Sequence, residues 1–205
     1  HEIINSNLLT APYTRTPKLP IRIELSNTGT SASNTSVSLI SMAVAQESSA
    51  PEVAKYNFSR SNGRTQIDST NAGIPVLSIQ PLANYNGIVN RVTIVPKTIQ
   101  AVCTNQTILI QVLLNPTLTG ASFTSVNANS ACAYDVSATA FSGGTIIAEF
   151  YVPNANETTF DMSQYTNVAQ LANNIAGTAG DILTLVTISV SGNGRTYTAI
   201  QWEEV

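Results

Sequence analysis

The sequence predicts an all-β protein, an antiparallel β-sandwich of the jelly-roll or immunoglobulin-like kind, preceded by an extended N-terminal arm. Three observations predict this fold. Short apolar segments with period-two alternation recur at intervals of roughly 8–12 residues along the chain. Gly-, Asn- and Pro-containing turns separate them, and no long segment has a helical period. A length of 205 residues suits a single β domain.

The arm is predicted for residues 1–20, because three prolines there favour extended backbone. Its apolar side chains are candidates for a contact with this domain or with a neighbouring subunit: Ile3, Ile4, Leu8 and Leu9. Residues 21–205 then form the sandwich, as one domain or as two packed subdomains divided near residues 96–106. Because the chain begins with His1 rather than Met, we expect a removed leader or a longer parent polypeptide.

The strand pattern also predicts which segments pair. Strands are expected at residues 21–25, 37–45, 55–58, 65–67, 76–79, 88–95, 98–102, 107–114, 134–140, 145–152, 182–190 and 195–203. Turn residues predict three hairpins: through Asn62-Gly63, through Ser142-Gly143-Gly144, and through residues 191–194. Pro96 is expected to end a strand, residues 154–164 to form a loop, and residues 166–176 to be a short helix or an irregular strand.

Composition excludes several classes of partner. Only 10% of residues are charged, against a typical value of about 25%. The net charge is -3 and no Lys/Arg cluster exists, which argues against nucleic-acid binding. The longest apolar run, residues 108–114, is far shorter than the roughly 20 residues of a membrane span. A surface of Ser, Thr, Asn and Gln suits extracellular proteins and large assemblies.

The sequence offers little material for catalysis or for a cofactor. The only histidine is His1, which argues against Ser–His and Cys–His catalysis and against His/Cys zinc sites. Asp135 and Glu149 would be cross-strand neighbours in the hairpin through Ser142-Gly143-Gly144, yet we interpret them as solvent-facing strand residues rather than a catalytic pair. Asp161 and Asp181 lack calcium-loop spacing. We expect a protein that is not an enzyme and binds no metal or cofactor.

Cys103 and Cys132 are the only cysteines, and two readings of them are equally good. A disulfide between them would close a loop of about 30 residues and contribute roughly 3 kcal/mol. Alternatively both are buried free thiols, which a reducing cytoplasm would favour.

Several blocks of the chain resemble structural proteins of tailed-bacteriophage virions. They are IPVLSIQP (74–81), VTIVPK (92–97), LNPTLTGASFTSV (114–126), residues 129–140, SGGTII (142–147), IAGTAGDILTLV (175–186) and AIQWE (199–203). Together they span about the last two-thirds of the chain. The resemblance implies a β-sandwich of the fibre, appendage or capsid-decoration type, located in the virion. It also implies contacts with other virion proteins and with copies of itself, for example as a trimer.

Two functional hypotheses follow. The first is a non-enzymatic virion structural protein, a head or tail fibre or a capsid-decoration module, with attachment to a host-surface glycan or protein as a further role. The alternative is a secreted, pilus-like filament subunit on the cell surface, in which residues 1–20 donate a strand to the next subunit. A lectin or carbohydrate-active enzyme is disfavoured by the aromatic content of 6% and by the lack of paired acids.

Overall fold

The computed structural model describes residues 56–67, 73–174 and 176–205. The predicted arm at residues 1–20, with Ile3, Ile4, Leu8 and Leu9, lies outside the described residues. The strands predicted at 21–25 and 37–45 also lie outside them.

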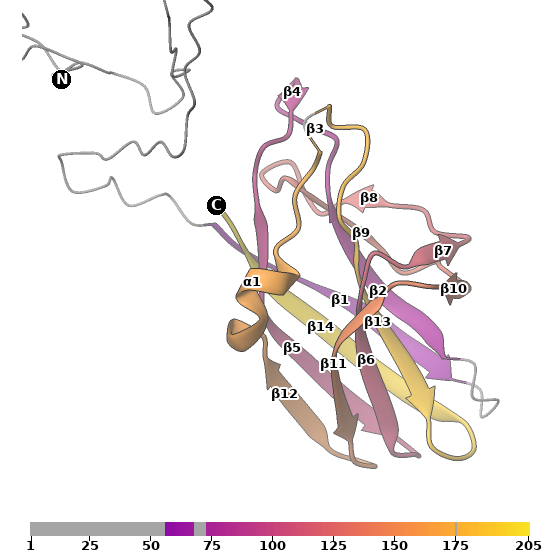
Figure 1. Ribbon diagram of the computed structural model, residues 1–205. Helices are drawn as coiled ribbons and strands as arrows, with labels where there is room; N and C mark the ends of the chain where they lie inside the picture. Colours follow the sequence, from indigo (N-terminus) through magenta and orange to yellow (C-terminus); the bar gives the residue numbers. More distant parts are fainter. Residues whose placement is uncertain (1–55, 68–72, 175) are drawn as a thin grey trace, which may run out of the picture. The chain divides into compact units, whose positions relative to one another are not determined.

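Eight strands form two antiparallel sheets (Figure 1). They are β1 (Tyr56–Ile67), β2 (Ile74–Pro81), β5 (Ile94–Thr104), β6 (Ile108–Leu114), β11 (Thr145–Val152), β12 (Glu157–Asp161), β13 (Leu183–Ser189) and β14 (Gly194–Glu204). The first sheet has the order β1-β14-β5-β12, and the second contains β2, β13, β6 and β11 as consecutive neighbours. The predicted antiparallel sandwich is confirmed.

The connectivity is that of a jelly roll. The first strand pairs with the last, β2 with β13, β5 with β12, and β6 with β11. The connection from β6 to β11 stays within one sheet, and every other connection between these eight strands crosses to the opposite sheet. One long antiparallel hairpin is thereby folded over on itself, which produces the two packed sheets of this architecture.

Smaller elements decorate this framework. β9 (Cys132–Asp135) and β8 (Thr124–Ser125) extend the second sheet beyond β2. β7 (Thr117–Thr119) pairs with β10 (Ala140–Ser142), and β3 (Asn84–Tyr85) pairs with β4 (Ile88–Val89). A 3-10 turn at Ser163–Tyr165 leads into the one-turn helix α1 (Thr166–Ala169).

The two ends of the sandwich differ in the length of their loops. The connections β5–β6, β11–β12 and β13–β14 are each only a few residues long, and they share one end because Thr104 pairs with Arg195 and Val152 with Ile108. The connections β2–β5, β6–β11 and β12–β13 are longer and share the opposite end, which we call the long-loop end (Figure 1). β1 begins there and β14 ends there, since Tyr56 pairs with Glu204.

The core lies between the sheets in two apolar clusters. The larger is built around Trp202, 1% exposed, which stacks on Phe58 with ring centroids 6.2 Å apart. The smaller contains Ala101, Cys103, Ile108, Ile110 and Val152. Residues of β14 alternate as predicted, and its inner face carries Thr196, Thr198, Ile200 and Trp202.

All three predicted hairpins are wrong. Residues 134–140 and 145–152 do not pair, because β9 lies beside β2 while β11 lies beside β6. β13 and β14 belong to different sheets, so residues 191–194 arch from one sheet to the other. Period-two alternation with a short turn is common to a hairpin and to such an arch, and the local pattern does not separate them.

The Asn62-Gly63 step lies within strand β1 rather than between two strands. The register against β14 shifts between Ser61 and Arg64, which is a β-bulge, and Gly63 adopts a φ of +69°. The Asn62 side-chain oxygen accepts a hydrogen bond of 2.8 Å from the backbone N–H of Thr198. Gly63 therefore has the positive φ expected of a tight turn, but here it belongs to a bulge, and the strand continues beyond it.

Two other local expectations also fail. Pro96 lies inside β5, next to a register shift against β14 and outside the part of β5 that pairs with β12, where its missing N–H is tolerated. Residues 154–164, expected as a loop, contain strand β12. Residues 166–176, expected as a short helix or an irregular strand, contain the one-turn helix Thr166–Ala169, and Leu171 then forms an isolated β-bridge with Ile94.

Truncation of Trp202 tests the larger cluster. We expect Trp202→Ala to lower the free energy of unfolding by about 3–5 kcal/mol, because it removes a fully buried ring and leaves a cavity. Urea denaturation would measure this, with Gln201→Ala on the exposed face of β14 as the control, expected within about 0.5 kcal/mol of the wild type. A loss under 1 kcal/mol for Trp202→Ala would contradict this packing.

Candidate functional site: the long-loop end

The longest connection, residues 115–144 between β6 and β11, covers part of the outer face of the second sheet. Ser78 and Thr184 lie on that face, and both are at most 1% exposed and joined by a hydrogen bond of 2.9 Å between their hydroxyls. Phe141 of β10 lies against Gly73, where an added Cβ would be 3.2 Å from its ring. This sheet therefore has its own covering layer.

Asp135 fixes the fold of this insertion. Its carboxylate accepts hydrogen bonds from the backbone N–H groups of Ser122, Ser137 and Ala138 and from the Ser137 hydroxyl. Burial alone would raise the pKa of Asp135, but these hydrogen bonds outweigh it and the pKa is lowered from its ordinary value. An acid that sequence reasoning assigned to solvent is thus 2% exposed and holds two loop segments together.

Glu204 joins the end of β14 to the same insertion. It accepts hydrogen bonds from the Ser130 hydroxyl (2.5 Å), the Ala131 backbone N–H (2.8 Å) and the Trp202 indole N–H (3.0 Å). Glu204 is 5% exposed. Hydrogen bonds to its carboxylate are charge-assisted, and they hold the end of the first sheet to the insertion of the second.

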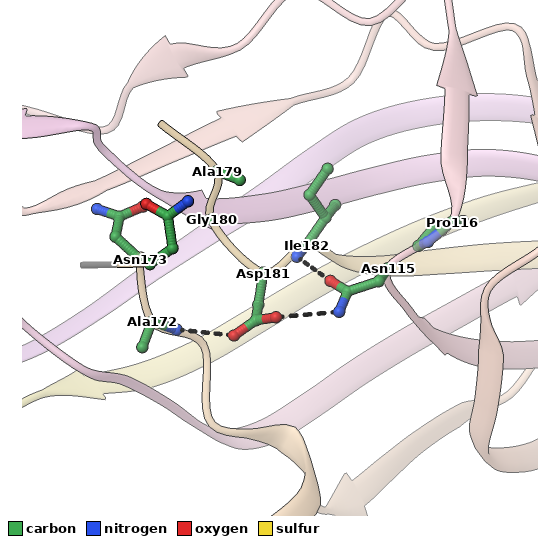
Figure 2. A pocket seen from close by; sticks show the side chains of 9 residues that line it. Asn115, Pro116, Ala172, Asn173, Ala179, Gly180, Asp181 and Ile182 are labelled. Atoms are coloured by element: carbon green, nitrogen blue, oxygen red, sulfur yellow. Dashed lines mark hydrogen bonds between the residues drawn. The ribbon is translucent and has the colours of Figure 1, made fainter. Parts of the chain in front are cut away.

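The connection β12–β13 forms a cleft of about 470 Å³ with the start of the insertion (Figure 2). In it the Asp181 carboxylate accepts bonds from the Asn115 side-chain amide (3.0 Å) and the Ala172 backbone N–H (3.2 Å). The Asn115 side-chain oxygen accepts from the Ile182 N–H at 2.7 Å. Asp181 is the only carboxylate in the lining, and both of its oxygens hold the loop, so the cleft offers no acid–base pair.

At Gly180 two walls of this cleft approach each other so closely that there is no room for a side chain. A Cβ at this position would lie 2.5 Å from the side-chain oxygen of Asn173. Asn173 in turn donates to the backbone oxygen of Leu82 at 2.7 Å, which ties the β12–β13 connection to the β2–β5 connection. The loops that line the cleft are therefore hydrogen-bonded to one another and to the start of the insertion.

Apolar side chains project into solvent from the same end. Ile88 at the tip of β3–β4 is 66% exposed, Val168 on α1 is 55% exposed, and Tyr56 at the start of β1 is 63% exposed. Val205 follows β14 and is 41% exposed. The long-loop end therefore combines a rigid polar network inside with apolar side chains outside.

The structure separates the two acids that the sequence placed together. Asp135 pairs with Ser78 in register, whereas Glu149 on β11 pairs with Gln111 and is exposed. The proposed neighbour relation is therefore wrong, because the hairpin that produced it does not form. Asp161 accepts from the N–H and hydroxyl of Ser163, and these bonds lower its pKa.

Both cysteines are buried free thiols in the structure. Cys103 belongs to the smaller core cluster and Cys132 to the larger. Burial raises the pKa of each, and the negative charge of Glu204 raises that of Cys132 further.

The described part of the chain contains no group of three or more His, Cys, Asp or Glu side chains placed to hold a metal ion. Among residues 56–67, 73–174 and 176–205, no helix combines the length and apolar character that crossing a membrane requires.

Comparison of the chain with protein-family models, with curated proteins and with solved structures finds no match.

The Asp135 contacts predict a pH dependence of stability. A lowered folded-state pKa means that this contribution is complete above the unfolded-state value of about 3.9 and is lost as pH falls through the folded-state value. We expect Asp135→Asn to cost about 1.5–3 kcal/mol near pH 7, with a smaller deficit below about pH 3.9. Urea denaturation across pH would show this, with Glu149→Gln as the exposed control; a deficit independent of pH would contradict the assignment.

Thiol titration tests the state of the cysteines. Because both are buried with raised pKa values, we expect neither to react with an aromatic disulfide reagent in the native protein. Both should react after denaturation without reductant. Detection of fewer than two thiols in the denatured, unreduced chain would instead indicate a bridge.

Proposed function

We propose that this protein is a non-enzymatic structural component of a virion, a jelly-roll module that contacts other virion proteins and copies of itself. The observation that carries the proposal is the nested pairing of eight strands into a complete jelly roll. Viral capsid domains are among the principal users of this architecture, together with lectins and cupins. The likeness to viral capsid domains is one of fold.

The chemistry of the described residues favours the structural role over the other users of the fold. Cupins hold a metal in the barrel, whereas the space between these sheets is filled by the two apolar clusters. The cleft at the long-loop end has a single carboxylate, Asp181, whose oxygens both bond to the protein. A low content of charge also fits extensive uncharged contacts between subunits.

The sheet edges favour side-chain contacts over strand donation. Edge strand β1 carries a bulge and the inward-pointing Arg60, both of which discourage pairing with another chain. β11 has a register shift between Ile146 and Ala148, and β12 is only five residues long. The eight strands of the jelly roll are all supplied by the described residues. A filament built by strand donation is therefore the weaker proposal.

We expect the protein to copurify with virus particles from a culture that produces it. Particles would be banded on a density gradient and their protein content quantified by mass spectrometry. A fixed copy number per particle, retained after a high-salt wash, supports the proposal. Recovery of the chain only as a free monomer, absent from the particle band, would overturn it.

Removal of residues 1–20 distinguishes a virion module from a filament subunit that polymerises by strand donation. A filament subunit that polymerises by strand donation would lose its high-mass assemblies in native mass measurements of the truncated chain. A virion module would keep the circular dichroism spectrum of a folded β protein and its presence in particles.

A further inference from the structure

The cleft at the long-loop end holds a hydrogen-bond acceptor and a donor side by side (Figure 2). The side-chain amide of Asn115 donates to one oxygen of the Asp181 carboxylate at 3.0 Å. The other carboxylate oxygen accepts from the Ala172 N–H at 3.2 Å, and the Asn115 side-chain oxygen accepts from the Ile182 N–H at 2.7 Å. Neither side chain can rotate without breaking two hydrogen bonds.

The backbone holds both residues in the same way. Asn115 has a φ of +55° and its N–H donates to the Ile182 carbonyl at 2.8 Å, so it bonds to Ile182 through backbone and side chain alike. The Asp181 N–H donates to the Ala172 carbonyl at 3.1 Å, so Asp181 bonds to Ala172 in both ways. The pair is therefore preorganised, which removes part of the entropic cost of binding a ligand.

This pair keeps hydrogen-bonding capacity that the protein does not use. An ionised carboxylate has about four acceptor sites, and a side-chain amide has two N–H donors. Within the described part of the chain, Asp181 accepts two bonds and Asn115 donates one N–H of its amide. Both residues line the cleft, so an acceptor and an N–H donor remain there for a ligand.

The rest of the cleft suits a small neutral ligand. Its volume of about 470 Å³ lies within the usual range of small-molecule sites, about 300–1,000 Å³. Pro116, Ala179 and Ile182 give it apolar surface. Its described lining contains no Lys, Arg or aromatic residue.

We propose that this cleft binds a neutral saccharide, with two adjacent hydroxyls of one sugar ring on Asp181 and Asn115. A hydroxyl both donates and accepts, so one can donate to the carboxylate while its neighbour accepts from the amide. A cation would satisfy the carboxylate but would leave the amide N–H without an acceptor. An acidic sugar would place its charge against that of Asp181, so neutral sugars are favoured.

The saccharide site goes beyond the proposed structural role, and its test needs only the isolated chain. A negative result therefore leaves incorporation into particles unaffected. Because the described lining offers no aromatic ring for a sugar to stack on, we expect a Kd of roughly 1–10 mM for a single site. Repetition of the module on one surface would strengthen such weak binding through avidity.

A chemical-shift titration of the isotope-labelled full chain tests the site. Methyl glycosides of glucose, galactose and mannose would each be added up to about 100 mM. At least one should give saturable shifts at the Ala172 and Ile182 N–H groups and at the Asn115 side-chain amide. Tetrahydropyran, which has the ring without the hydroxyls, and methylguanidinium, a cation, should give none. The proposal is overturned if no glycoside gives saturable shifts, or if either control compound binds as tightly as the sugars.

The variant Ala179→Leu localises the binding. Ala179 is exposed and lines the cleft, so a leucine there occupies the space without removing a core contact or a side-chain hydrogen bond. We expect it to weaken binding by roughly tenfold or more. Ala128→Leu is the matched control and keeps the wild-type affinity, since Ala128 is also exposed but lies in a turn of the insertion outside the cleft lining. Equal affinity of Ala179→Leu and the wild type would place the sugar elsewhere and overturn the assignment.

Discussion

The pairing of β14 with both β1 and β5 is the constraint on which the rest of the structure depends. β14 runs the length of the first sheet between these strands, and its inner face supplies Trp202 and Ile200 to the larger cluster. Its last residues pair with the start of β1, and Glu204 reaches across to the insertion of the second sheet. The eleven residues of β14 therefore align two of the other three strands of the first sheet, β1 and β5, and tie that sheet to the insertion.

Alternation predicts strand faces well and strand partners badly. The inner face of β14 and the apolar character of β6 are read directly from period two. Partner choice in a jelly roll depends on contacts between residues more than a hundred positions apart, such as Phe58 with Trp202. Short turns at residues 142–144 and 191–194 have the composition of hairpin turns, yet they join strands that do not pair with each other.

Most hydrogen bonds of the long-loop end could not be predicted from the sequence, although those of Asp135 have a local sequence pattern. Asp135 is followed by Val-Ser-Ala, and an Asp with Ser two positions later is typical of a side chain that accepts from the next turn. Nothing local marks Asp181 as a partner of Asn115, and two of the three partners of Glu204, Ser130 and Ala131, lie far from it in the sequence.

The start of β1 and the end of β14 lie side by side, since Tyr56 pairs with Glu204. Tension transmitted through these two flanks would load the hydrogen bonds between β1 and β14 one after another, because the bonds of an antiparallel pair lie across the strands. Peeling of this kind yields at lower force than sliding two strands past each other. The fold would therefore resist a load applied through the side chains of its sheets better than one applied through the start of β1 and the end of β14.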